Sequence, residues 1–151
     1  MTKFIIKSTL VFSLALLIGC EEGTLFEDSF SSVTISSIQV LDYNENYIDD
    51  TLFEGDPDIY ISIYKGSSYV GKTETNQGLS SWVLNGGILP LTITDSNFNS
   101  SYQFLLKDDD PDADDSIGGF ENVYFSEHEG ESSIELIGGG NHFVLNLTWE
   151  N

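Results

Sequence analysis

One stretch joins an apolar run to a cluster of acids: Tyr102-Gln103-Phe104-Leu105-Leu106-Lys107-Asp108-Asp109-Asp110-Pro111-Asp112-Ala113-Asp114-Asp115-Ser116-Ile117-Gly118. It holds six carboxylates between residues 108 and 115. Unit charges about 4 Å apart repel each other by roughly 1 kcal/mol in water and by more near a protein surface. Because apolar residues flank the cluster on both sides, it predicts a loop at one end of a sheet that binds a cation, which we interpret as calcium.

The rest of the domain reads as short strands. Alternation is clear in Ile59, Ile61 and Ile63, and in Phe143, Leu145, Leu147 and Trp149, where every second residue faces one side. Clusters of Gly, Asn, Ser and Asp separate the runs, and no helical period stands out. We therefore predict an all-β, eight-stranded antiparallel β-sandwich. Its strands are expected at Val33–Leu41, Ile59–Tyr64, Tyr69–Thr75, Ile88–Thr94, Tyr102–Leu106, Asn122–Phe125, Ser133–Ile137 and Phe143–Trp149.

Composition limits the partners. The chain has 151 residues, 40% of them hydrophobic, which predicts one folded domain despite a formal net charge of -20. Beyond residue 19 the basic residues are three lysines, Lys65, Lys72 and Lys107. Phosphate recognition needs clustered basic side chains, so nucleic acid is not expected as a partner. Divalent cations are the expected ligands.

The N-terminus has the features of an export signal. Lys3 and Lys7 precede an apolar stretch, Leu10 to Ile18, that is too short to span a bilayer as a stable helix. It ends in Leu17-Ile18-Gly19-Cys20, which resembles the lipobox of bacterial lipoproteins, whose cysteine is lipidated. We predict a signal peptide at 1–19, then Cys20 and an acidic tether at 20–32, and the sandwich domain at 33–150. The protein is expected to be lipid-anchored in the bacterial cell envelope, at the outer membrane, on its periplasmic or its surface side.

A second acidic loop precedes the Ile59 strand. Asp50 and Asp56 lie six residues apart around a short tip that carries Leu52 and Phe53. Calcium takes six to eight oxygen ligands, and neither loop has the twelve-residue pattern of an EF-hand. The two loops are therefore expected to share the ion.

The order of these motifs resembles the C2 domain. Asp50 is followed by Asp56-Pro57-Asp58-Ile59-Tyr60 opening a strand; then come Lys72-Thr73-Glu74-Thr75, Trp82, Leu105-Leu106-Lys107-Asp108-Asp109-Asp110, and Asp115-Ser116-Ile117-Gly118. The resemblance covers residues 33 to 150. It implies the calcium-dependent, lipid-binding β-sandwich found in conventional protein kinase C and the synaptotagmins.

The resemblance also implies a ligand set. Asp50 and Asp56 would bind calcium from the first loop, with Asp108, Asp110 and one of Asp114 or Asp115 from the third loop. A second register would use Lys107 and Asp109 instead, and a lysine there would remove a ligand. We favour the first register, because alternation from Phe104 and Leu106 puts Asp108 on the same side as Asp110. Asp109 and Asp112 are then outer charges.

Three functions are carried forward. The leading one is a calcium-binding domain with a structural or binding role toward an envelope lipid, glycan or protein, and without enzymatic activity, because neither His128 nor His142 lies in a catalytic motif. The second is calcium-triggered phospholipid binding, in which Leu52 and Phe53 form a membrane-contact tip, although lysine is scarce. The third is a calcium-independent glycan- or protein-binding sandwich that uses aromatic faces at Tyr60, Tyr64, Tyr69 and Tyr102.

Overall fold

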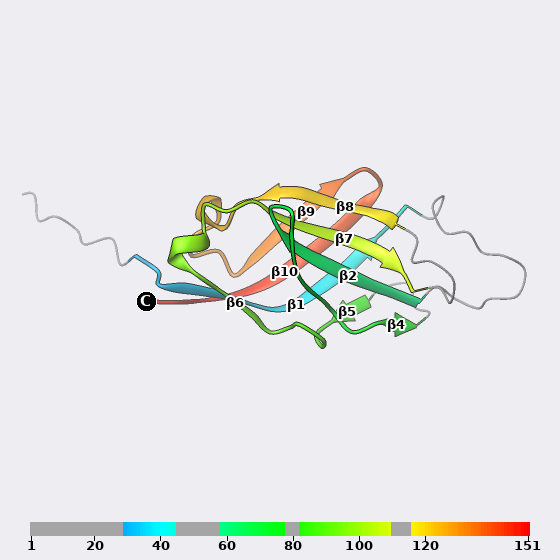
Figure 1. The fold of residues 1–151 in the computed structure, drawn as a ribbon, viewed down its shortest axis with the longest axis horizontal. Helices are drawn as coiled ribbons and strands as arrows, with labels where there is room; N and C mark the ends of the chain where they lie inside the picture. The colour runs from blue at the N-terminus through cyan, green and yellow to red at the C-terminus, as the bar shows by residue number, and fades with distance from the viewer. Residues whose placement is uncertain (1–28, 45–57, 78–81, 110–115) are drawn as a thin grey trace, which may run out of the picture.

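The computed structural model describes residues 29–44, 58–77, 82–109 and 116–151. These residues form two antiparallel sheets packed face to face, with two short 3-10 helices, η2 (Asp95–Asn97) and η3 (Phe125–Glu127) (Figure 1). Across these ranges no helix is long and apolar enough to cross a membrane. The predicted antiparallel β-sandwich is confirmed.

The first sheet is centred on β1 (Ser32–Asp42) and β10 (Asn141–Glu150), which pair along their whole length. β9 (Ser133–Gly138) pairs with the other edge of β10. Two short strands, β5 (Trp82–Leu84) and β6 (Leu91–Thr94), pair with successive parts of β1 on its free side. They act as one interrupted edge strand.

The second sheet has the order β3-β2-β7-β8. β2 (Asp58–Lys65) lies between β7 (Tyr102–Asp108) and the shorter β3 (Ser68–Lys72) and β4 (Asn76–Gln77), which pair with successive parts of β2. β8 (Ser116–Val123) pairs with the far side of β7. With each pair of short strands counted as one position, both layers are four strands wide.

The core lies between the layers and follows the period of two that strands impose. On β2, Ile59, Ile61 and Ile63 are fully buried, and on β10 Phe143 and Leu145 are fully buried. Further buried side chains come from both sheets: Val33, Ile35, Ile38, Val40, Phe104, Leu106, Ile117 and Ile134. The predicted inward faces of these strands are thus confirmed.

The eight predicted strands overlap eight of the ten described strands, but some bounds differ: the strand expected at Tyr69–Thr75 ends at Lys72, and the strand expected at Ile88–Thr94 begins at Leu91. β4 and β5 span two and three residues, too few to show a pattern in the sequence. The strand expected at Asn122–Phe125 begins earlier, at Ser116, and ends at Val123, while Phe125 belongs to η3. Gly118 and Gly119 on this strand have no side chains to reveal the alternation.

The chain enters the sandwich at one end, where the C-terminus also lies (Figure 1). The Ser31 N–H donates to the Glu150 carbonyl at 2.7 Å, and the Phe30 ring lies 5.1 Å from the Trp149 ring, centroid to centroid. β2 begins and β7 ends at the opposite end of the sandwich, on the right of Figure 1. We call this opposite end the loop end.

Candidate functional site: aspartates at the loop end

Three aspartates lie at the described rim of the loop end. Asp58 is the first residue of β2, Asp108 is the last residue of β7, and Asp109 follows it. Antiparallel pairing sets Ile59 opposite Asp108, so the start of one strand and the end of the other meet at this rim. The sheet itself therefore brings together two acids, Asp58 and Asp108, that are 50 residues apart in the sequence.

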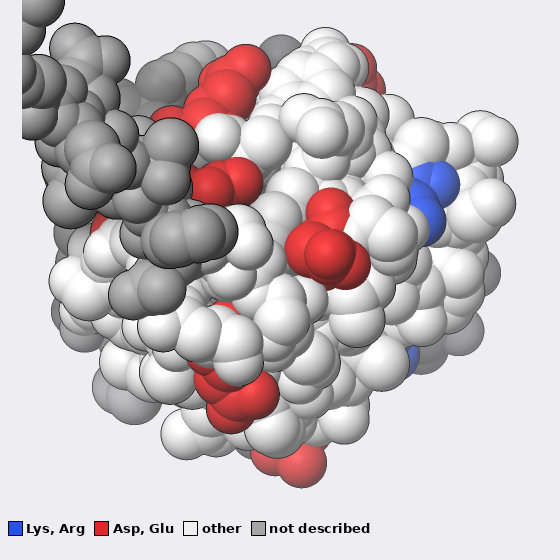
Figure 2. All heavy atoms as spheres, turned by 90° about the vertical axis from the view of Figure 1, so that its left-hand side faces the viewer, with Lys and Arg blue, Asp and Glu red and all other residues white. Residues whose placement is uncertain are grey.

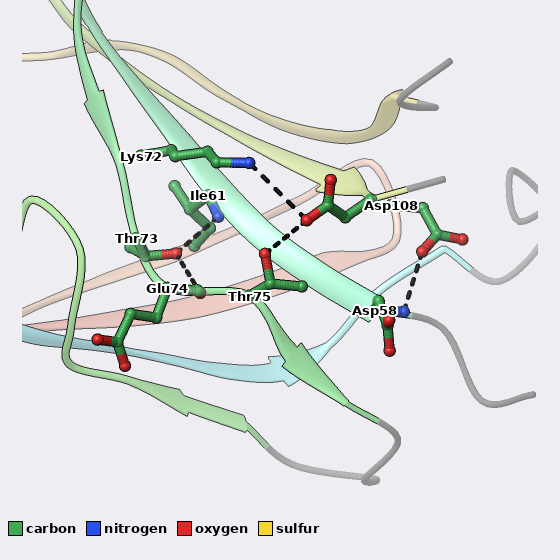
Figure 3. Close-up of polar contacts among 8 residues, drawn as sticks. Asp58, Ile61, Lys72, Thr73, Glu74, Thr75 and Asp108 are labelled. Atoms are coloured by element: carbon green, nitrogen blue, oxygen red, sulfur yellow. Dashed lines mark hydrogen bonds and ion pairs between the residues drawn. The ribbon is translucent and has the colours of Figure 1, made fainter. Parts of the chain in front are cut away.

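Asp108 faces the interior. It continues the buried series Phe104 and Leu106 and is only 6% exposed. Its Oδ1 accepts a hydrogen bond from the Asp58 N–H at 3.0 Å, and the Asp109 N–H donates to the Asp58 carbonyl at 2.8 Å. The first of these bonds fixes the direction of the Asp108 carboxylate at the point where β7 leaves the sheet (Figure 3).

Asp109 is held on the outer side of the second sheet instead. Its Oδ2 accepts a hydrogen bond from the Thr75 hydroxyl at 2.7 Å and lies 3.8 Å from the Lys72 ammonium. That ammonium also lies 4.1 Å from the centre of the Tyr60 ring, in cation–π range. Asp109 thus has a local counter-cation, Lys72, and a hydroxyl partner, Thr75, both of which are labelled in Figure 3.

Thr73 shapes the segment that delivers these partners. It is 1% exposed, and its Oγ1 accepts a hydrogen bond from the Ile61 N–H at 3.0 Å and donates to the Glu74 carbonyl at 3.1 Å. The Thr73 N–H donates to the Ile61 carbonyl at 3.0 Å. The side chain therefore takes the place of a strand partner between β3 and β4 and positions Lys72 and Thr75.

Of the metal ligands expected from the sequence, Asp108 is within the described residues. Asp50, Asp56, Asp110, Asp114 and Asp115 lie outside them, as do the lipidation residue Cys20 and the tip residues Leu52 and Phe53. Among residues 29–44, 58–77, 82–109 and 116–151, no group of three or more His, Cys, Asp or Glu side chains is arranged to hold a metal ion. Asp108 offers hard oxygen donors at the rim, the ligand type that calcium prefers.

The orientation of β7 bears on the two registers left by the sequence. Asp108 faces inward, whereas Lys107 pairs with Tyr60 and alternates to the outer face with Gln103. Asp109, in contrast, is engaged with Thr75 and Lys72. Sequence reasoning missed Asp58 and Thr73 as parts of the rim. Two features of the sequence could have indicated them: Asp58 lies two positions after Asp56, and Thr73 directly follows the end of β3.

Two of the four tyrosines proposed as a binding surface are not on the surface. Tyr60 is 2% exposed and Tyr102 is 4% exposed. Lys72 lies over the Tyr60 ring, and the Tyr102 ring packs edge-on against Phe125 with the ring centroids 5.4 Å apart. The expectation of exposed faces at these two positions is wrong. Burial also raises the pKa of the Tyr102 hydroxyl above 10.0. Tyr69 is exposed, and its ring contacts Tyr64.

No protein-family model matches the sequence, and no curated protein matches it either. Solved structures do resemble the fold. A structure described as that of a C2 domain aligns with a TM-score of 0.55 and 15% identity, over 80% of this chain and 99% of that chain. This chain has a C2-like fold.

Two larger proteins contain a unit similar to this C2-like domain. A calcium-bound pair of C2 domains from extended-synaptotagmin 2 aligns with a TM-score of 0.53 and 17% identity, over 80% of this chain and 45% of that one. Human GIVD cytosolic phospholipase A2, in complex with methyl gamma-linolenyl fluorophosphonate inhibitor and terbium chloride, aligns with a TM-score of 0.57 and 16% identity. The alignment covers 82% of this chain and 18% of the phospholipase, so the C2-like domain matches a small part of that protein.

Proposed function

We propose that this C2-like domain binds calcium at its loop end and belongs to a lipid-anchored protein of the bacterial cell envelope. The ligands are Asp50 and Asp56 from the first loop and Asp108, Asp110 and Asp114 or Asp115 from the third. The observation that carries the proposal is the inward Asp108 carboxylate, fixed by the Asp58 N–H at the end of β7. The similarity to calcium-bound domains of extended-synaptotagmin 2 supports the choice of ion.

The electrostatics favour a divalent cation. The loop after β7 carries aspartates whose mutual repulsion grows as they leave bulk water, and a doubly charged ion offsets that repulsion. Lys72 contacts Asp109 on the outer side of the rim. Calcium therefore supplies the positive charge that the interior side of the rim requires.

The role of the bound ion is structural or adhesive, and the domain is not an enzyme. Each histidine lies beside a glutamate: His128 Nδ1 is 2.9 Å from Glu131 Oε2, and His142 Nε2 is 2.7 Å from Glu135 Oε1. These are two-residue surface pairs on separate elements. The domain binds a lipid, glycan or protein of the envelope, and the acyl chains on Cys20 hold the protein at its membrane.

Calcium-triggered docking on anionic phospholipid has less support. Such docking needs lysines available to the headgroups. Lys72 contacts Asp109 and Tyr60, and Lys65 donates to the Asn97 side chain. The net charge of -20 repels an anionic surface until calcium is bound.

The test compares two neighbouring, isosteric substitutions. Asp108→Asn keeps an oxygen that accepts from the Asp58 N–H but removes the charge, so the fold is retained and calcium affinity, measured by isothermal titration calorimetry, falls at least tenfold. Asp109→Asn removes an equal charge on the outer face. The calcium affinity of this variant is expected to stay within about threefold of that of the unmodified chain, because the lost charge acts on the ion only at long range. Thermal unfolding in chelator verifies that both variants fold. Equal losses of affinity at the two positions would refute the assigned register.

A further inference from the structure

The outer surface of the first sheet has no charged residue over most of its area. In a chain with 25 acidic residues, none lies within 32–41, 82–94 or 143–149, and neither does a lysine. These segments contain β5, β6, most of β1 and most of β10, which are neighbours in one sheet. We call the outward side chains of these strands the neutral face: Thr34, Ser36, Ser37, Gln39, Leu41, Val83, Thr92, Val144, Asn146 and Thr148.

The neutral face combines exposed apolar groups with ordered polar ones. Val83 is 49% exposed and Leu41 is 40% exposed. The hydroxyl oxygens of Thr34 and Thr92 lie 2.9 Å apart on neighbouring strands, and the Asn146 amide donates to the Ser37 hydroxyl at 2.9 Å. Because these polar groups already bond to one another along the sheet, covering them costs less than covering free side chains.

Charges lie around the neutral face rather than on it. Asp42 ends β1 and Glu150 ends β10, and Glu135 on the edge strand β9 is 2.7 Å from His142. The acids also spread over the end of the molecule that carries η2 and η3, as Figure 2 shows. The neutral face is thus an uncharged area bordered by acids at the ends of β1 and β10 and along β9.

We propose that the neutral face is the contact between two copies of this chain. Each copy carries a net charge of -20, so a pair that met at other surfaces would bring carboxylates together. Two sheets pack about 10 Å apart, and charges are screened over about 8 Å at physiological salt. Carboxylates on two facing sheets would therefore still repel each other. A contact between uncharged faces avoids this repulsion, because the acids then lie at its periphery. In a dimer with two-fold symmetry the same face of each copy meets the other, so one uncharged face supplies both sides of the contact.

The size of the face sets the strength of the contact. Three strand positions about 4.8 Å apart, with a β1 about 36 Å long, give roughly 500 Å² per copy. Two copies then bury roughly 1,000 Å², which is at the lower limit for a specific interface. The expected dimer is therefore weak and depends on concentration. It requires neither calcium nor the lipid anchor.

The test uses one isosteric substitution on each sheet. Gln39 pairs with Val83 on one side and Val144 on the other, at the middle of the neutral face. Gln103 is also half-buried and outward, but on β7 of the second sheet. The full-length chain, solubilised in a mild detergent, is studied by sedimentation velocity over a range of concentrations and at low and high NaCl. Gln39→Glu and Gln103→Glu are the matched variants.

The unmodified chain is expected to form a concentration-dependent dimer that becomes tighter at high salt, because salt screens the repulsion between the copies. Gln39→Glu is expected to raise the dimer dissociation constant at least tenfold, whereas Gln103→Glu leaves it within about twofold. A monomer at all concentrations would overturn the proposal. So would a dimer that salt weakens, or one that the two variants affect equally.

Discussion

Thr73 provides the most quantitative test of how the loop end is built. The change Thr73→Val keeps the shape of the side chain and removes the hydroxyl that accepts from the Ile61 N–H at 3.0 Å. Ile61 is fully buried, so its N–H is left without an acceptor in a site that water does not reach. An unsatisfied buried donor costs about 1 to 3 kcal/mol, and the lost bond to the Glu74 carbonyl adds about 0.5 to 1.5 kcal/mol, giving about 1.5 to 4.5 kcal/mol in total.

The control is Thr75→Val, two residues further along the chain. The Thr75 hydroxyl donates to Asp109 Oδ2 at a half-buried position, where water can replace it, so the expected loss is about 0.5 to 1 kcal/mol. Urea unfolding of each variant, followed by tryptophan fluorescence, gives the free energy of unfolding. A Thr73→Val loss equal to or smaller than that of Thr75→Val would refute the claim that Thr73 replaces a strand partner of Ile61.

Other predictions concern single positions. Gly87→Ala is expected to destabilise the domain by about 2 kcal/mol or more, since Gly87 has φ +68 and an added Cβ would lie 2.4 Å from the Lys72 carbonyl oxygen. Unfolding in urea measures this loss, and an unchanged midpoint would contradict the prediction. Because the pKa of Tyr102 is raised in the folded state, the Tyr102 hydroxyl loses its proton at lower pH in the unfolded chain than in the folded one. The stability that is present below pH 10.0 is therefore lost as the pH rises through the folded pKa. Tyr102→Phe should therefore flatten the alkaline part of the stability profile, and an identical profile would argue against it. Cys20→Ala is expected to release the exported protein from membranes without detergent, and continued sedimentation with the membrane fraction would exclude the lipid anchor. Phe53→Ser is expected to leave calcium-dependent liposome pull-down unchanged, and loss of binding would favour the phospholipid role.

Much of the fold is encoded in local patterns. Ile59, Ile61 and Ile63 alternate with polar or aromatic residues, and this period alone predicts the inward face of β2. β4 and β5 escaped the prediction because two or three residues carry no period. The start of β8 escaped it because Gly118 and Gly119 have no side chain to alternate.

At the loop end, too, some features could be predicted from the sequence and others could not. Alternation along β7 predicted that Asp108 and Asp109 face opposite sides, and the structure places one inward and the other beside Thr75 and Lys72. The contact of Tyr60 with Lys72 was not predictable, because Lys72 lies on a neighbouring strand. Contacts between strands far apart in sequence require the register, which no single segment contains.

Calcium binding at the loop end is the central claim, and thermal unfolding tests it most directly. The domain is melted in chelator, then across a calcium titration, with magnesium as the control ion. A ligand that binds only the native state raises the midpoint by an amount set by its concentration relative to its dissociation constant. Calcium is expected to raise the midpoint in a saturable way and magnesium is not, because magnesium demands a tighter octahedral geometry. A midpoint that neither ion moves would contradict calcium binding at the loop end.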